Sequence, residues 1–176
     1  MPHIHTASGQ HDHTVSACIV RTDTTEPQAL LHMHRKMQKL LYIGGHIELD
    51  ETPWQAITHE LTEESGYDIS QLAVLQPAER MKQMDGAIVH PYPVCINTHP
   101  IGDDHYHTDI NYAFVTDQNP QSSIATGEST DIRWLTQAEL HKLDVSSVAS
   151  GVIDVYDFIF DVCLEQWERV STEFFQ

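Results

Sequence analysis

Residues 44–67 read GGHIELDETPWQAITHELTEESGY, and this stretch decides how the rest of the sequence is interpreted. It predicts a helix from Pro53 to Ser65. Thr52 is expected to begin it with a capping box, because its hydroxyl can accept from a free backbone N–H while the glutamine three residues later reaches back. Proline suits the first helical position, where an N–H would be unbonded anyway. Gly66 suits the left-handed residue that ends a helix.

Apolar and acidic side chains separate around this helix at 100° per residue. Three apolar residues form a stripe that we expect to be buried: Trp54, Ile57 and Leu61. Glu60, Glu63 and Glu64 share an adjoining arc of about 100°, where their like charges repel. No lysine or arginine lies between Lys39 and Arg80 to relieve this repulsion. A divalent cation would do so, and oxygen ligands suit Mg²⁺ or Mn²⁺.

The same stretch resembles the signature of the Nudix hydrolases, G-x5-E-x7-R-E-U-x-E-E-x-G-U, in which U is a bulky apolar residue. The matching positions are Gly45, Glu51, Glu60, Leu61, Glu63, Glu64, Gly66 and, more loosely, Tyr67. One defined position departs from the pattern, because His59 stands where the family has arginine.

The strand and helix pattern alone indicates an α/β or α+β class, and the resemblance implies the Nudix α/β/α sandwich with a mixed β-sheet. We expect a flexible N-terminal tail over residues 1–13 and a single domain over residues 14–176. The expected strands are 14–21, 29–35, a strand–turn–strand piece within 40–48, 72–75, Tyr92–His99, Tyr106–Thr116 and 131–135. Thr136 should cap a short helix to Leu143, and Val145–Glu173 is expected to be mostly one long helix.

The resemblance implies metal-dependent hydrolysis of a phosphoanhydride bond in a nucleoside diphosphate linked to another group. A nucleoside triphosphate, canonical or oxidised, is the first expectation for the substrate, and dinucleoside polyphosphates and nucleotide sugars are alternatives. Glu60, Glu63 and Glu64 would be the catalytic and metal-binding residues, with the Gly45 carbonyl as a further ligand. Glu51 would orient the helix through His59.

A further carboxylate is expected from outside the signature, because three glutamates on one helix approach a metal from one side only. Glu128 is the first candidate, since its place before Trp134 is similar to that of a metal-binding or basic glutamate in some Nudix enzymes. Asp103, Asp104 and Asp109 are rival candidates.

Alternation along the strand 106–116 places polar residues on one face and apolar residues on the other. The polar set, counted from just before the strand, is His105, His107, Asp109 and Asn111. This face could line the substrate site, hold a transition metal through two histidines and an aspartate, or simply be solvated. His46 and Lys39 lie close to the glycine turn in sequence and are further candidates for substrate contact.

The formal net charge is −17, from 9 basic and 26 acidic residues. This argues against duplex nucleic acid or an anionic membrane as partners, because both are bound through basic surfaces. A nucleotide substrate is compatible with it, since metal ions can neutralise the phosphates. The oligomeric state is left open, with a homodimer as one option.

The three cysteines, Cys18, Cys95 and Cys163, are widely spaced in apolar surroundings. They indicate reduced thiols and a cytoplasmic protein. No apolar run reaches the length of about 18 residues that a membrane span requires, and the N-terminal residues lack the features of a secretory signal.

Two alternatives to an enzyme remain. One is a Nudix-like module that has lost catalysis and senses a nucleotide, although such modules usually lose acidic signature positions that are kept here. The other is a calcium-binding acidic protein, which lacks the loop of an EF-hand.

Overall fold

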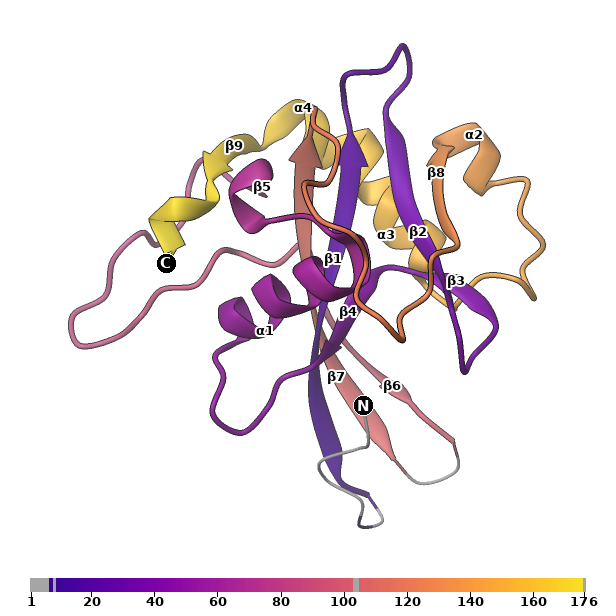
Figure 1. Ribbon diagram of the computed structural model, residues 1–176. Helices are drawn as coiled ribbons and strands as arrows, with labels where there is room; N and C mark the ends of the chain where they lie inside the picture. Colours follow the sequence, from indigo (N-terminus) through magenta and orange to yellow (C-terminus); the bar gives the residue numbers. More distant parts are fainter. Residues whose placement is uncertain (1–6, 8, 103–104, 176) are drawn as a thin grey trace.

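A mixed β-sheet forms the centre of the protein, in a computed structural model that describes residue 7, residues 9–102 and residues 105–175 (Figure 1). In this part of the chain the main path of the sheet is β3 (Lys39–Leu41), β2 (Gln28–His34), β1 (His11–Arg21), β7 (Tyr106–Thr116), β5 (Ala73–Gln76) and β9 (Glu168–Ser171). Three strands pair beside this path: β4 (Ile43–His46) with β1, β6 (Cys95–Pro100) with β7, and β8 (Ile132–Thr136) with β2. The β1–β7 pair is parallel and the other pairs are antiparallel.

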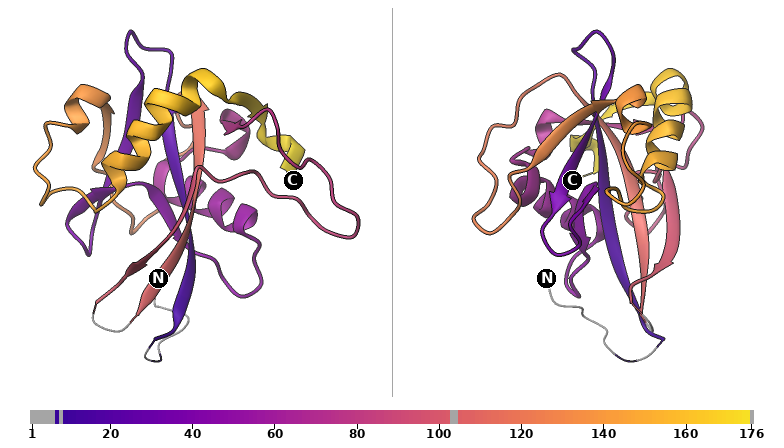
Figure 2. Two further views of the ribbon diagram at one scale, coloured as in Figure 1. Left: turned by 180° about the vertical axis from the view of Figure 1, so that it is seen from behind. Right: turned by 90° about the vertical axis from the view of Figure 1, so that its right-hand side faces the viewer.

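Helices cover both faces of this sheet (Figure 2). On one face lies α1 (Pro53–Glu60), which continues as a π-helical turn (Leu61–Ser65). On the other lie α3 (Val152–Phe158), a second π-helical turn (Ile159–Cys163) and α4 (Leu164–Gln166). The remaining elements are α2 (Gln137–Leu140) and two 3₁₀ turns, Ile69–Gln71 and Thr172–Phe175. The expected α/β/α sandwich is confirmed.

Strand β1 shows how alternation divides the core into two layers. Its odd-numbered residues, such as Ala17 and Ile19, pack in the layer under α1, which contains the expected stripe of Trp54, Ile57 and Leu61. Its even-numbered residues, such as Cys18 and Val20, pack in the layer under α3. Odd-numbered side chains of β1 therefore face the α1 layer, and even-numbered side chains face the α3 layer.

The signature helix begins and ends as its sequence predicts. Thr52 accepts from the Gln55 N–H, and the Gln55 side chain accepts from the Thr52 N–H, so the capping box is complete. Gly66 ends the helix with φ of 74°, in the left-handed region that favours glycine. One feature was not expected: the last turn, Leu61–Ser65, is π-helical.

The prediction of one helix over Val145–Glu173 is wrong at both ends. The helix begins only at Val152, and after α4 the chain forms β9, which pairs antiparallel with β5. Strand β5 would otherwise be the edge of the sheet with unpaired backbone groups. Pairing with β9 satisfies those groups, and Val170 packs against the α1 layer of the core.

Two further boundaries differ from expectation. Strand β6 begins at Cys95 rather than Tyr92, because the prolines at 91 and 93 have no N–H to donate and the Tyr92 N–H is bonded to the Gln76 side chain. Helix α2 ends at Leu140 rather than Leu143.

Strand β1 begins at His11, so residues 11–13 of the expected tail lie in the sheet, and residues 1–6 and 8 are outside the described part. The division into tail and domain stays a prediction. None of the described helices is long and apolar enough to cross a membrane.

Candidate active site

The three signature glutamates lie in different environments. Glu60 and Glu64 are buried, with exposed fractions of 5% and 7%. The Glu63 side chain is about half exposed, at 46%. The helix therefore directs the carboxylates of Glu60 and Glu64 into the protein and leaves that of Glu63 at the surface.

The paired glycines of β4 receive the two buried carboxylates. The turn expected at these glycines is wrong, because both lie inside the strand and pair with β1, Gly44 opposite Ser16 and Gly45 opposite Val15. The Gly44 N–H donates to Glu64 Oε2 at 3.0 Å. A Cβ atom at Gly45 would lie 2.1 Å from Glu60 Oε1, so only glycine leaves room for that carboxylate. The close approach of the Glu60 carboxylate thus explains the glycine at 45, whereas the glycine at 44 is explained by the backbone of β1, which a Cβ there would meet.

Burial makes these carboxylates hard to ionise. It raises the pKa of Glu60 to about 7, an effect that neighbouring His59 opposes and that the charges of Glu63 and Glu128 increase. Burial likewise raises the pKa of Glu64 to about 8, against the hydrogen bond from Gly44, and Glu60 and Glu128 add to the shift. Two acidic groups held this way favour a cation that would stabilise their charged forms.

His59 lies between two carboxylates at the surface of the helix. Its Nε2 is 3.1 Å from Glu63 Oε1, and its Nδ1 is 3.6 Å from Glu51 Oε1. Partial burial alone would lower the pKa of His59, but the hydrogen bond and charge of Glu63, with Glu60 and Glu51 nearby, raise it. The histidine therefore lies between Glu51 and Glu63, and the orienting role that the resemblance implies for it stays a prediction.

The loop between β7 and β8 is attached to the end of the signature helix. The Ser122 N–H donates to the Gly66 carbonyl at 3.0 Å, and the Ala125 N–H donates to the Glu63 carbonyl at 2.8 Å. The Arg35 guanidinium also donates to the Gly127 carbonyl. These contacts bring the next residue, Glu128, close enough to Glu60 and Glu64 to influence both.

His32 of β2 is a site residue that the sequence analysis did not select. It is buried, with 1% exposed, and its Nε2 lies 3.7 Å from Glu64 Oε2. Burial lowers its pKa to about 4, so the ring is neutral near pH 7. The available signal was a histidine that follows the apolar run of residues 29–31 and shares a face of the strand with Leu30.

The donor set fits a hard divalent cation. Glu60 and Glu64 are oxygen donors held against β4, and the Gly45 carbonyl belongs to the same strand. Glu63 and Glu128 add acidic groups around the pair. Oxygen-only donors of this kind match Mg²⁺ or Mn²⁺ rather than a softer metal.

The comparison with protein families gives one decisive result: the model described as the NUDIX domain matches residues 12–155. The chain belongs to the Nudix family. It is a hydrolase, and the general activity that the family supports is hydrolysis of nucleotide pyrophosphate bonds. Comparison with curated proteins gives no match.

Solved structures resemble this Nudix hydrolase over most of its length. A NUDIX-family hydrolase from Clostridium perfringens is 25% identical, with a TM-score of 0.65, over 84% of this chain and 97% of that one. The NUDIX domain of Shewanella oneidensis NrtR, in complex with ADP ribose, is 14% identical with a TM-score of 0.59, over 84% and 87% of the two chains. The E. coli dihydroneopterin triphosphate pyrophosphohydrolase is 16% identical with a TM-score of 0.59, over 87% and 95%.

Five of the expected substrate-binding residues of this Nudix protein lie on the other face of the sheet from α1: His46, His105, His107, Asp109 and Asn111. Asp109 accepts hydrogen bonds from Thr14 and Ser16, even-numbered residues of β1, and His46 pairs with Thr14. Even-numbered β1 residues face the α3 layer, so this group is not brought together with the glutamates.

The other expected residues are less informative. Lys39 is in β3, opposite His34 of β2. Asp103 and Asp104 lie outside the described residues. Asp109, the third rival of Glu128, is buried in the hydrogen bonds just described, on the face of the sheet away from the glutamates.

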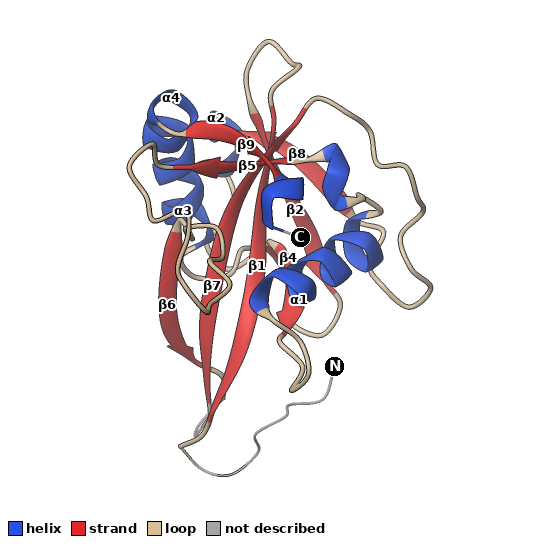
Figure 3. Ribbon diagram, turned by 90° about the vertical axis from the view of Figure 1, so that its left-hand side faces the viewer, coloured by secondary structure: helices blue, strands red, loops and turns tan. Residues whose placement is uncertain are grey.

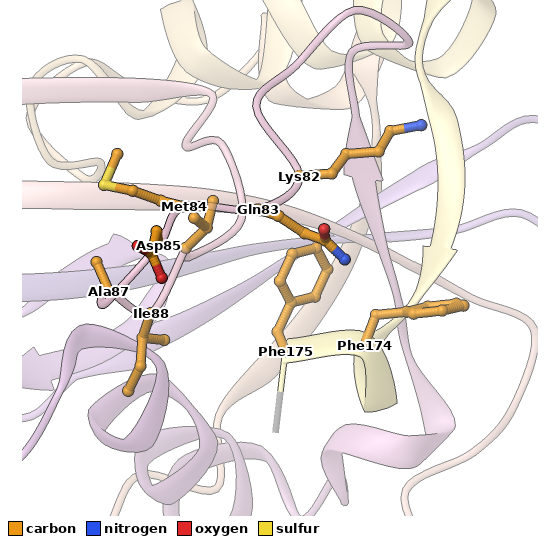
Figure 4. Close-up of a pocket in the computed structure, with 9 residues that line it drawn as sticks. Lys82, Gln83, Met84, Asp85, Ala87, Ile88, Phe174 and Phe175 are labelled. Atoms are coloured by element: carbon orange, nitrogen blue, oxygen red, sulfur yellow. The ribbon is translucent and has the colours of Figure 1, made fainter.

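A hollow elsewhere on the surface does not include the glutamates. It lies between the loop before β6 and the C-terminal 3₁₀ turn (Figure 4). Its lining includes Met84, Ile88 and Phe174, all exposed. Trp54 at the start of α1 contacts Phe175 beside it, with ring centroids 5.5 Å apart. This hollow offers apolar contact but no acidic cluster for phosphate chemistry.

Proposed function

We propose that this Nudix protein hydrolyses a phosphoanhydride bond of a nucleoside triphosphate, canonical or oxidised, and requires Mg²⁺ or Mn²⁺. The observation that carries the proposal is the burial of Glu60 and Glu64 against the paired glycines of β4. A purely structural surface helix would not place two ionisable groups where charge is costly.

Each residue then has a defined task. Glu60 and Glu64, with the Gly45 carbonyl, would hold the cation, and Glu63 and Glu128 would stand beside it. When bound, the cation supplies charge neutralisation for the phosphates and lowers the pKa of water. Glu60 and Glu64 are also the candidates to take the proton from the attacking water.

The substrate assignment is tested by a panel of nucleotides with Mg²⁺. The panel contains canonical and oxidised nucleoside triphosphates, dinucleoside polyphosphates and nucleotide sugars, and the products are separated to distinguish pyrophosphate from phosphate. We expect the fastest hydrolysis for a triphosphate. A clear preference for a nucleotide sugar or a dinucleoside polyphosphate would overturn the triphosphate assignment but keep the hydrolysis of a phosphoanhydride bond.

A second candidate function is nucleotide binding without hydrolysis. It is favoured by the similarity of fold to the NrtR NUDIX domain, whose structure contains ADP ribose. The retained glutamates, with buried carboxylates at 60 and 64, argue for the enzyme. Saturable binding of ADP ribose with no turnover of any panel member would support the binding module instead.

Replacement of Glu128 tests its assignment as a further site carboxylate. We expect Glu128→Gln to lower the rate by about 10-fold or more and to shift the Mg²⁺ titration to higher concentration, because one acidic group near the metal is lost. Asp131→Asn is the matched control, since this exposed carboxylate pairs with Arg133 instead. A normal rate and normal Mg²⁺ dependence for Glu128→Gln would remove the residue from the site.

Replacement of His59 tests whether its positive charge is needed. The pKa of His59 is raised, so the charge is present at low pH and is lost as pH rises through that pKa. If the charge orients Glu51 and Glu63, activity should decline as the pH rises through the pKa of His59. His59→Arg should remove this decline, because arginine stays charged. His59→Gln should lower activity below the pKa of His59, where the parent histidine is charged. An unchanged pH–rate profile in His59→Arg would show that only a neutral hydrogen bond is required.

A further inference from the structure

The lower ends of β1, β6 and β7 extend past both helix layers (Figure 3). On the α3 face of this extension, side chains from three strands meet at Asp12. The strands β1 and β7 are in register there, with Asp12 opposite His107. Strand β4 joins from the other side of β1 and contributes His46.

The carboxylate of Asp12 is surrounded by imidazoles. Asp12 is fully buried, with 0% exposed. Its Oδ2 lies 3.2 Å from His105 Nε2 and 3.5 Å from His46 Nε2. The His107 ring contacts both histidines, with centroids 5.5 Å from His105 and 5.0 Å from His46. His99 lies beyond, 5.7 Å from His107 between ring centroids.

We propose that Asp12, His105 and His107 form a metal site for Zn²⁺, separate from the glutamate site. Within the described part of the chain, these three form the only group of His, Cys, Asp or Glu residues that each offer one ligand atom with all of these atoms within 4.8 Å of one another. Two imidazole nitrogens and one carboxylate oxygen are a typical three-ligand zinc set, which keeps the fourth position for water.

The geometry of the strands supports a defined metal site rather than non-specific attraction of cations to an acidic protein. Asp12 lies in β1 and His107 in β7, which are joined by a continuous parallel ladder from His11 to Arg21, and His105 directly precedes β7. Side chains on such rigid elements are well placed to hold a metal with little reorganisation. His46 stands next to the same carboxylate and would orient it as a neighbouring group. The acid is Asp12, whereas the sequence had suggested Asp109.

The two sites differ in the metals they prefer. Nitrogen donors select Zn²⁺ over Mg²⁺, while the glutamates offer oxygen only. The glutamates also lie on the α1 side of the sheet, and the Asp12 cluster on the α3 side. The zinc site therefore does not depend on the proposed substrate, and it can be measured while excess Mg²⁺ occupies the glutamate site.

The experiment is titration of the full chain with Zn²⁺ by calorimetry in excess Mg²⁺. We expect one Zn²⁺ per chain and a rise in the thermal midpoint, because a ligand that binds only the folded state stabilises it. His105→Gln and His107→Gln should each weaken binding by more than about 100-fold and remove the thermal shift, and His46→Gln should weaken it by about 10-fold.

Two controls make the result specific. His13→Gln changes an exposed histidine next to Asp12 that points to the other face of β1, and it should bind Zn²⁺ normally. Glu60→Gln/Glu64→Gln removes the glutamate site and should also keep the zinc site. Circular dichroism checks that the glutamine variants remain folded. The proposal is overturned if Zn²⁺ does not bind in excess Mg²⁺, or if His105→Gln and His107→Gln bind it as the parent protein does.

Discussion

Glu64→Gln is expected to lower the rate of nucleotide hydrolysis by about 10²–10⁴-fold, the range typical for loss of a group that acts on the proton or the metal. The substitution keeps the size of the side chain and an oxygen that can accept from the Gly44 N–H. It removes the negative charge at the buried position. Initial rates with saturating Mg²⁺ provide the measurement, and Glu79→Gln, which changes an exposed carboxylate in the loop after β5, is the control.

The same variant should be more stable than the parent protein when no metal is added. Burial raises the pKa of Glu64 to about 8, so the unfolded chain loses its proton at lower pH than the folded one. The parent protein therefore loses stability as pH rises from about 4.5 to about 8, by about 1.4 kcal/mol for each unit of pKa difference. Glutamine does not titrate, so the variant should not lose this part of its stability as the pH rises.

Thermal unfolding at several pH values measures the difference. The midpoint of Glu64→Gln should exceed that of the parent by an amount that grows between about pH 5 and pH 8. Glu63→Gln should also lose activity but gain little stability, because the Glu63 side chain is about half exposed. If Glu64→Gln keeps full activity, the assignment of the signature carboxylates fails, whatever its stability.

Alanine should have different effects at the two paired glycines: it should lower stability at Gly44 and activity at Gly45. At Gly44, a Cβ would lie 2.1 Å from the Val15 carbonyl oxygen and 3.0 Å from Ser16 Cα, which are backbone atoms of β1. Strand β4 would have to move away from β1, so Gly44→Ala should cost about 1–3 kcal/mol of stability. Chemical denaturation measures this loss.

At Gly45, a Cβ would meet only the Glu60 carboxylate, which is the flexible end of a side chain. Gly45→Ala should therefore fold with nearly normal stability, but it should hydrolyse nucleotides at least about 10-fold more slowly, because small displacements at a site are costly. Gly86→Ala is the control for both: nothing lies within 4 Å of its added Cβ, and its cost comes only from a φ of 71°. A normal rate for Gly45→Ala would mean that Glu60 need not occupy this position.

Local interactions explain why the signature helix could be predicted from the sequence alone. The Thr52 cap, the buried stripe and the left-handed Gly66 depend on residues no more than four positions apart. The acidic arc followed from the same periodicity. What periodicity could not give was the difference in burial between Glu60 and Glu63, since that depends on how closely β4 approaches the helix.

The C-terminal segment shows where local patterns are insufficient. The apolar spacing of residues 152–167 is helical, and the structure is helical there in large part. Beyond Trp167 the chain forms β9 because β5, far away in sequence, offers unpaired backbone groups. A pattern within the segment itself contains no information about that partner.

The sequence by itself determined the fold family, the signature helix and the alternation of polar and apolar residues along 106–116. Only the tertiary structure decided which face of the sheet each polar residue meets. Strand pairing placed His46 and His107 on the Asp12 face of the sheet, away from the glutamates, and backbone bonds from Ser122 and Ala125 hold the loop before Glu128 against the end of the signature helix. The physical reason is that a strand's two faces are equivalent until pairing and packing assign one to each helix layer.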